Sequence, residues 1–365
     1  HYEARVRSHK KFGTAVLIFP DGFKVDVATA RMEYYEYPGA RPIVETSSLK
    51  MDLYRRDFTI NTLAIKLNKR DYGTLIDHFG AMKDIKGKVL RVLHNLSFVE
   101  DPTRMFRAIR FEQRFNFRIG RLTLALIKNA AKMSILKEPS HRRFFMELRL
   151  ILKEQDPVSA IKRMDDFNLL QFISPEIRFT KRVELLLEEI RKVMDWYSLL
   201  YLEGTYEPWK VYWHGLTSLL SISSLKALAE KNGMVNQDSR KMIFQRESMA
   251  KIQNGFYKIS NDSYQIYTLL SPYDTESLLY MMARTNSEKA KRLISSYFTK
   301  LKGTKILLKG RDLSNMGFQP GPVYREIFDR VLEARLNNLI KTKEDEVRFV
   351  EEHFDPRQPD QMSPR

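Results

Sequence analysis

The sequence predicts an α+β fold in which a small sheet comes first and a long run of helices follows. Two patterns predict it. Near the start, β-rich residues that alternate in polarity flank a Pro20-Asp21-Gly22 turn, and from residue 101 onward the apolar residues recur at helical spacing. With 365 residues the chain is too long for one compact core, so we expect two or more domains.

The first hundred residues carry the strand signals. We predict a β-hairpin over 12–30, because two alternating runs meet at a Pro-Asp-Gly turn. Residues 31–48 hold Pro38, Gly39 and Pro42, which favours a long loop, and 58–66 is a strand candidate.

The remaining chain carries helical periodicity. The clearest segments are 101–117, 121–132, 139–153, 157–169, 181–202, 261–271, 285–302 and 323–340.

The composition narrows the classes of function. A ratio of 62 Lys and Arg to 45 Asp and Glu gives a net charge of +17, which favours a polyanionic partner such as nucleic acid, although simple solubility is the alternative. The absence of cysteine excludes disulfides, zinc–thiolate sites and thiol nucleophiles, and it fits a reducing cytoplasm. No apolar run predicts a membrane span, no protein partner can be inferred, and we interpret the start at His1 as an internal cut.

The first polar cluster runs from Arg55 through Arg56 and Asp57 to Asn61. Two guanidiniums beside a carboxylate form either a surface ion-pair patch or a triphosphate site in which the carboxylate accepts a ribose hydroxyl. The residues alone leave both readings open.

The second cluster begins at Ser97 and leads into a helix. Ser97 and Glu100 fit a capping box, and Asp101 before a proline fits a helix N-cap. A column of arginines then repeats every three residues, at Arg104, Arg107 and Arg110. A guanidinium column on a helix with an apolar back indicates an anionic ligand, and a carboxylate one turn from a guanidinium can pair with the edge of a base.

The third cluster, Asp77 to Asp84, predicts a turn and nothing more on physical grounds. In chain order, however, the clusters at 55–61, 77–84 and 97–110 resemble motifs B, C and D of class II tRNA nucleotidyltransferases and of their relatives, the bacterial poly(A) polymerases. The segment 138–148 resembles the helical element that follows these motifs, and 310–322 is similar to the tail of long bacterial members.

The resemblance implies a partial nucleotidyltransferase head, similar to polymerase β, with an antiparallel or mixed sheet, followed by a mainly helical neck, body and tail. It implies a head at 1–66, a neck at 67–180, a body at 181–303, a tail at 304–354 and a disordered terminus at 355–365.

The resemblance also implies roles for single residues. Arg55, Arg56 and Asp57, with Asn61 beside them, would hold the phosphates and ribose of ATP or CTP. Asp101 and Arg104 would act as a protein template for the base, and Glu100 would brace them. Arg107 and Arg110 would contact the triphosphate, 31–48 would be the flexible loop that lets the pocket switch toward ATP, and the third cluster would be a hinge. The helices after residue 181 would grip the acceptor and TΨC region of tRNA by shape and phosphate.

Magnesium ions are the expected cofactor, and relatives hold them with an Asp-x-Asp strand that this chain lacks. We expect the main ligands upstream of His1. Asp26 would be a third carboxylate, or it is an ordinary exposed strand residue. The chain by itself is therefore expected to be inactive. The activity would be CCA addition or terminal A addition, and the alternatives are a poly(A) polymerase and a non-catalytic RNA-binding relative.

Overall fold

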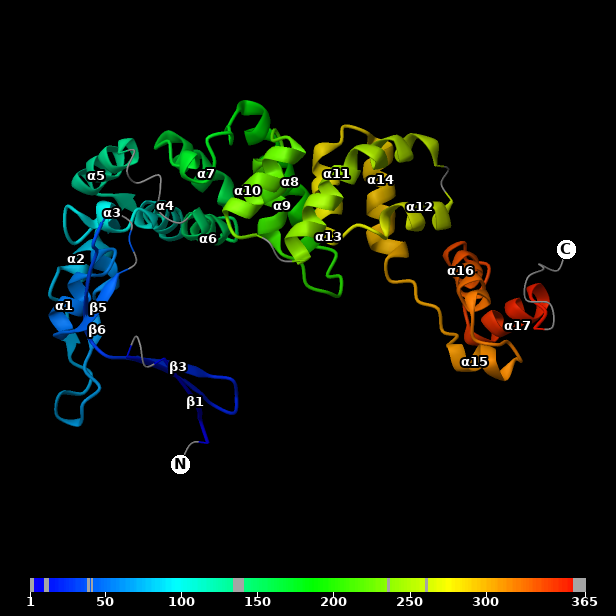
Figure 1. Cartoon of the computed structure of the whole chain (residues 1–365), viewed down its shortest axis with the longest axis horizontal. Coiled ribbons are helices and arrows are strands. Elements are labelled where there is room, and N and C mark those ends of the chain that lie inside the picture. Colours follow the sequence, from blue (N-terminus) through cyan, green and yellow to red (C-terminus); the bar gives the residue numbers. More distant parts are fainter. Residues whose placement is uncertain are drawn as a thin grey trace. The chain divides into compact units, whose positions relative to one another are not determined.

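The structure is a computed structural model that describes residues 3–9, 13–37, 40, 42–133, 141–234, 237–259 and 262–356. The chain divides into two compact units. One comprises His1–Glu184 and Lys226–Met234, and the other comprises Leu185–Leu225 and Val235–Arg365. All strands of the described residues lie between Arg5 and Ile119, and helices account for the rest of the regular structure (Figure 1). The α+β prediction is confirmed, whereas the four predicted boundaries between the five segments stay a prediction.

The strands of the first unit form four small sheets. Their bounds are β1 Arg5–His9, β2 Thr14–Ile18, β3 Lys24–Ala28, β4 Arg31–Tyr34, β5 Ile43–Thr46, β6 Ala64–Ile65, β7 Leu75–Ile76, β8 Val89–Leu90 and β9 Arg118–Ile119. One sheet has the order β1-β2-β3, and the others are the pairs β4-β5, β6-β7 and β8-β9. β2 and β3 pair antiparallel with Val16 opposite Asp26, which confirms the predicted hairpin.

Two predictions in the first part of the chain are wrong. Residues 31–48 contain the antiparallel pair β4-β5 rather than only a loop, because Pro38, Gly39 and Pro42 fall between the two strands and not within them. The strand expected at 58–66 is mostly a 3-10 turn, Thr59–Asn61, followed by the two-residue β6. The Thr62 hydroxyl donates to the Thr59 carbonyl at 2.7 Å, so a local turn replaces an extended ladder.

The helices of the first unit carry the polar clusters. Their bounds are α1 Leu49–Tyr54, α2 Ala81–Lys86, α3 Ser97–Glu100, α4 Thr103–Phe115, α5 Arg121–Lys132, α6 His141–Ile151 and α7 Pro157–Asp166. The predictions of helices at 101–117, 121–132 and 157–169 are confirmed. The prediction for 139–153 is confirmed from His141 onward, and 134–140 lies outside the described residues.

The start of α4 differs from the capping expected there. Ser97 begins the short helix α3, and its hydroxyl accepts a hydrogen bond from Arg104 instead of capping a helix with Glu100. Asp101 does act at the start of α4, because its Oδ1 accepts the Thr103 backbone N–H at 3.1 Å. The proposed capping box is therefore wrong, since the Ser97 hydroxyl faces a guanidinium.

The third cluster is more than a turn. Asp77 accepts the backbone N–H groups of Ala81 and Met82 at 2.8 and 3.0 Å, and so it supports the start of α2. Gly80 precedes the helix with a φ of 76°, a left-handed conformation that suits glycine. Asp84, in the helix itself, is buried and pairs with Arg91 at 2.7 Å.

A core of apolar side chains fixes α4 in the first unit. Met105, Phe106, Ala108 and Ile109 of α4 are fully buried, as its apolar periodicity predicted. The Phe106 ring lies 5.2 Å from the Phe144 ring of α6, centroid to centroid. The arginines of α4 meet polar groups of residues 55–57, of α3 and of α6.

The helices after residue 180 have the following bounds: α8 Lys181–Ser198, α9 Pro208–Leu216, α10 Ile222–Lys231, α11 Gln237–Lys258, α12 Ser263–Leu270, α13 Thr275–Arg284, α14 Glu288–Ser296, α15 Gly310–Asn315, α16 Pro322–Leu336 and α17 Lys343–His353. A π-helical turn, Tyr297–Leu301, continues α14. A search of the described residues finds no helix that could span a membrane. Leu313, Ile327, Val331 and Val350 form the centre of a separate apolar cluster in the last fifty residues described.

Candidate nucleotide-binding site

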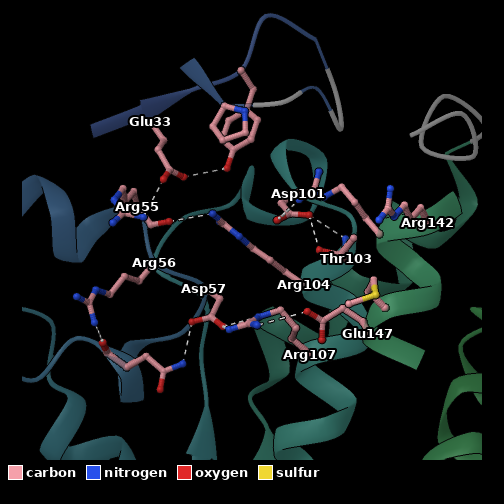
Figure 2. Close-up of a pocket in the computed structure, with 15 residues that line it drawn as sticks. Glu33, Arg55, Arg56, Asp57, Asp101, Thr103, Arg104, Arg107, Arg142 and Glu147 are labelled. Carbon is pink, nitrogen blue, oxygen red and sulfur yellow. Dashed lines mark hydrogen bonds and ion pairs between the residues drawn. The ribbon is translucent and has the colours of Figure 1, made fainter. Parts of the chain in front are cut away.

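A cavity of about 900 Å³ lies in the first unit among segments that are far apart in the sequence. It is lined by Glu33, Tyr35, Pro42, Arg55, Arg56, Asp57, Asn61, Asp101, Thr103, Arg104, Arg107, Arg142, Arg143, Met146 and Glu147 (Figure 2). The lining holds six arginines and four carboxylates. An excess of guanidinium groups in a concave site favours an anionic ligand.

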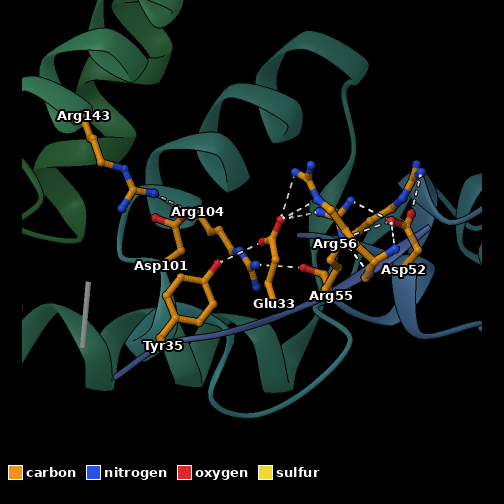
Figure 3. A network of polar contacts seen from close by, with 9 residues as sticks. Glu33, Tyr35, Asp52, Arg55, Arg56, Asp101, Arg104 and Arg143 are labelled. Carbon is orange, nitrogen blue, oxygen red and sulfur yellow. Dashed lines mark hydrogen bonds and ion pairs between the residues drawn. The ribbon is translucent and has the colours of Figure 1, made fainter. Parts of the chain in front are cut away.

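Asp101 is held by contacts to both of its carboxylate oxygens. Its Oδ1 accepts from the Thr103 hydroxyl at 2.6 Å, and its Oδ2 accepts from Arg143 of α6 at 2.8 Å. These contacts, to Thr103 (Figure 2) and to Arg143 (Figure 3), fix the plane of a carboxylate that lines the cavity. A carboxylate has about four acceptor positions, so capacity remains for a ligand.

Arg104 lies one helical turn after Asp101, and its side chain is also fixed by two hydrogen bonds. Its guanidinium donates to the Ser97 hydroxyl at 2.8 Å and to the Arg55 carbonyl at 2.9 Å, and the residue is 5% exposed. The carboxylate of Asp101 and the guanidinium of Arg104 thus meet the same cavity in fixed orientations. Preorganised donors and acceptors of this kind recognise a ligand without a large cost in side-chain entropy.

The arginines that follow α1 are tied to acidic neighbours. Arg55 donates to Asp52 at 2.8 Å and to Glu33 of β4 at 2.9 Å, and Arg56 contacts Asp52 at 3.3 Å (Figure 3). Burial opposes the charge of Asp52, but hydrogen bonds and charge from Arg55, with further hydrogen bonds from Arg31 and Arg56, lower the pKa of this carboxyl. The two guanidiniums are therefore part of a network and not an isolated surface patch.

Asp57 and Arg107 line the cavity and form an ion pair with each other. Asp57 Oδ2 accepts from Arg107 Nε at 2.8 Å, while Asp57 Oδ1 accepts from Asn61 at 2.9 Å. Arg107 also donates to Glu147 of α6 at 3.4 Å (Figure 2). Burial raises the pKa of Glu147 even though Arg107 and Arg110 oppose that rise. The Phe58 backbone N–H also donates to Asp57 Oδ1 at 2.9 Å, and a second N–H of Arg107 donates to Oδ2, so four donors already occupy this carboxylate. A ribose hydroxyl at Asp57 would have to replace one of them.

Three of the predicted site residues are not among those that line the cavity. The Glu100 carboxylate faces His94 at 3.4 Å, and Arg110 is buried against Glu147 at 3.7 Å and over the Phe111 ring. Asp26 is exposed on β3. The other predicted residues, Arg55, Arg56, Asp57, Asn61, Asp101, Arg104 and Arg107, lie together. The roles assigned to all ten residues stay predictions.

Eight residues that line the cavity were not predicted individually as site residues: Glu33, Tyr35, Pro42, Thr103, Arg142, Arg143, Met146 and Glu147. The first three belong to the segment 31–48, which was predicted to be the flexible loop of the pocket. The pair Arg142-Arg143, with Glu147 four positions after Arg143, is a pattern that could have suggested a charged helix face. Nothing in the local sequence near Glu33 and Tyr35 distinguishes them from other polar residues of β4 and its continuation.

The described residues do not fit a two-magnesium site. They contain no group of three or more His, Asp or Glu side chains arranged to hold a metal ion. Asp26, on an exposed face of β3, stands as a single candidate carboxylate, and the acids of the cavity are tied to arginines.

Two family profiles match the chain. One is described as the Poly A polymerase head domain and matches residues 1–91, and the other, the probable RNA and SrmB-binding site of polymerase A, matches residues 116–180. Among solved structures, a CCA-adding enzyme in its apo form II is similar with a TM-score of 0.73 and 32% identity over 96% of this chain and 82% of that one. The Thermotoga maritima CCA-adding enzyme complexed with tRNA is similar with a TM-score of 0.68 and 31% identity, over 96% of this chain and 81% of that one.

Curated relatives agree with these structures. The A-adding tRNA nucleotidyltransferase of Geobacter sulfurreducens is 50% identical over 95% of this chain, but this chain spans only 40% of the relative's length. The A-adding enzyme of Aquifex aeolicus is 36% identical over 89% of the chain, again with 40% of the relative covered. The A-adding enzyme of Halalkalibacterium halodurans is 30% identical over 97% of this chain and 80% of its own length. Together with the matching solved structures, these similarities show that the chain belongs to the tRNA nucleotidyltransferase family.

Proposed function

We propose that the cavity binds ATP or CTP and that Asp101 and Arg104 select the base. The observation that supports the proposal is that a fixed carboxylate and a fixed guanidinium, one helical turn apart, open onto an arginine-lined cavity. Adenine and cytosine both present an amino group beside a ring nitrogen on the Watson–Crick edge. A carboxylate accepts from the amino group and a guanidinium donates to the ring nitrogen, whereas guanine and uracil place a carbonyl where the amino group is needed.

In this proposal the arginines of the cavity bind the phosphates of the nucleotide. Arg55, Arg56 and Arg107 surround the part of the cavity next to Asp57, and Arg142 and Arg143 add charge from α6. Guanidiniums bind phosphate oxygens through paired N–H donors, which suits a triphosphate. Asp57 would accept a ribose hydroxyl while it keeps Arg107 in place.

In the whole protein we propose addition of the terminal A to the 3′ end of tRNA. The relatives named A-adding match 89–97% of this chain, whereas the CC-adding relative of Deinococcus radiodurans matches 43% of it. CCA addition is the second candidate, because the similar solved structures are CCA-adding enzymes. Magnesium as the cofactor is part of the same proposal.

The test of this activity uses the full-length protein with tRNAs that end before CCA, after C and after CC, each offered ATP or CTP separately. A-adding activity incorporates one A onto the CC-ending tRNA only. CCA addition also extends the two shorter tRNAs with CTP. Long A tracts on unrelated RNA would indicate a poly(A) polymerase, and no incorporation by the full-length protein would indicate a non-catalytic RNA-binding relative.

The binding step can be tested on residues 1–365 alone by titration calorimetry with ATP, CTP, GTP and inorganic tripolyphosphate. We expect the unchanged chain to prefer ATP over GTP by roughly tenfold or more, since each good bidentate base contact discriminates by about 1–3 kcal/mol. Asp101→Ala should remove most of this preference and leave tripolyphosphate affinity within about threefold.

Arg114→Ala is the matched control for Asp101→Ala. Arg114 lies on the same helix, α4, its side chain is 53% exposed, and it is not among the residues that line the cavity. If Asp101→Ala keeps the full preference for ATP over GTP, the template role is refuted. We also keep the prediction that the chain alone incorporates no labelled ATP or CTP into tRNA, and measurable incorporation would contradict it.

A further inference from the structure

Tyr35 is the single aromatic side chain among the described residues that line the cavity. It follows β4 directly and is half-buried, and its hydroxyl donates to Glu33 Oε2 at 3.3 Å. Glu33 is itself fixed by Arg55 at 2.9 Å and by Arg31 at 3.1 Å. The network therefore fixes the position of the Tyr35 hydroxyl and the direction in which the side chain extends (Figure 3).

The ring lies near the pair proposed to read the base. Figure 3 shows Tyr35 beside Asp101 and Arg104, with its hydroxyl turned toward Glu33. Burial raises the pKa of Tyr35 to about 12, Arg104 opposes the rise, and the charges of Glu33, Asp101 and Glu100 add to it. The side chain is thus a neutral, protonated phenol at any physiological pH.

Recognition of a base also requires a contact to the face of its ring, which Asp101 and Arg104 do not provide. Asp101 and Arg104 contact a base only in its plane, through its edge, and in-plane hydrogen bonds do little to hold a flat ring against displacement along its normal. The other residues that line the cavity are charged, polar or aliphatic. Proteins that hold unpaired bases commonly stack them on an aromatic face.

We propose that the ring of Tyr35 is the face on which the base of the bound nucleotide stacks, while Asp101 and Arg104 read its edge. This inference rests on the proposed function, because it requires the base to lie at Asp101 and Arg104. The hydrogen bond to Glu33 holds only the tip of the side chain, and stacking uses the face of the ring, so loss of the hydroxyl should have a smaller effect than loss of the aromatic face.

The experiment measures ATP and inorganic tripolyphosphate binding to residues 1–365 by calorimetry. Tyr35→Leu removes the aromatic face and keeps an apolar side chain, and it should weaken ATP binding roughly 5- to 100-fold, the range expected for loss of one base–aromatic stack. Its affinity for tripolyphosphate should stay within about twofold. Tyr35→Phe keeps the face and should hold ATP within about threefold of the unchanged chain.

Tyr37→Leu is the matched control, because Tyr37 is 64% exposed, two residues further on, and not among the residues that line the cavity. Three results overturn the inference: Tyr35→Leu binds ATP normally, Tyr35→Phe loses as much as Tyr35→Leu, or Tyr35→Leu loses tripolyphosphate affinity equally. Failure of the proposed function itself would give a fourth result, seen in the unchanged chain and not in the Tyr35 variants. In that case the unchanged chain binds ATP no better than tripolyphosphate.

Discussion

Thr103 of α4 and Arg143 of α6 both donate to the carboxylate of Asp101, so this residue joins the two helices. Arg143 reaches Asp101 across 42 positions of sequence, and Arg107 reaches Asp57 across 50. Motif resemblance predicted Asp101, Arg104 and Arg107 as single residues. It gave Arg143 no role. The contact between Arg143 and Asp101 depends on how α4 and α6 pack, and the local sequence around either residue does not specify that packing.

His214 of α9 is a residue whose environment has a measurable effect on stability. It is 1% exposed, its ring stacks 5.2 Å from that of Tyr280, and neither ring nitrogen has a hydrogen-bond partner among the residues that the structure describes. Burial, and then the charges of Arg246 and Lys210, lower the pKa of His214 to about 3. The neutral imidazole is therefore the form that the folded protein accommodates.

Acidification should destabilise the folded chain through this residue. Above pH 6.5 His214 is neutral in both the folded and unfolded states, so it has no effect. Between pH 6.5 and about 3 only the unfolded state takes up the proton, and the free energy of unfolding falls by about 1.4 kcal/mol per pH unit, or roughly 2 kcal/mol at pH 5. His214→Phe keeps a ring against Tyr280 but has no group that titrates. Between pH 7 and 5 its free energy of unfolding should fall by roughly 2 kcal/mol less than that of the unchanged chain.

Urea unfolding followed by tryptophan fluorescence measures the difference, because all three tryptophans lie within residues 196–213. His353→Phe, an exposed histidine of α17, is the control. Equal pH dependence of His214→Phe and the unchanged chain would show that the imidazole is protonated in the folded state.

Amphipathic helices were the elements that the sequence predicted best. The α5 helix begins and ends at the predicted residues, and α4 differs by two at each end. Each buries one continuous apolar face, so the local pattern and the packing agree. Short strands were predicted poorly, since β4, β6 and β7 have two to four residues each and depend on partners that a local pattern does not contain.

Glu346 of α17 is the polar residue on which the last helical cluster depends. It is fully buried, accepts the backbone N–H groups of Leu307 and Leu308 at 3.0 and 2.7 Å, and pairs with Arg335 of α16. Glu346→Ala would leave a guanidinium and two N–H groups without an acceptor. Loss of one partner from a buried ion pair costs about 3–5 kcal/mol.

We expect Glu346→Ala to lower the opening free energy of backbone amides in 304–354 by that amount, as measured by hydrogen exchange. Glu351→Ala, an exposed position on the same helix, should change it by no more than about 0.5 kcal/mol. Unchanged protection in Glu346→Ala would mean that water or another side chain replaces the carboxylate.

At the scale of the whole molecule, charge is the property that bears on the proposed tRNA partner. A net charge of +17 is spread over 365 residues, and only a fraction of the 62 basic side chains belongs to the cavity. Basic residues that neutralise phosphates release counterions from RNA when they bind. The logarithm of the binding constant then falls linearly with the logarithm of the salt concentration.

We therefore expect the affinity of the chain for a tRNA transcript to fall by at least about 100-fold between 50 and 200 mM salt, as for proteins that contact several phosphates. ATP affinity, measured on the same sample, should fall much less, because a single triphosphate neutralises fewer charges and lies among arginines already paired with acids. A matched duplex DNA gives the second comparison. It should show a similar salt slope but weaker binding, since recognition by A-form shape and 2′-hydroxyls is available only in RNA. A tRNA affinity that does not change with salt would show that the surplus charge serves solubility and not the RNA.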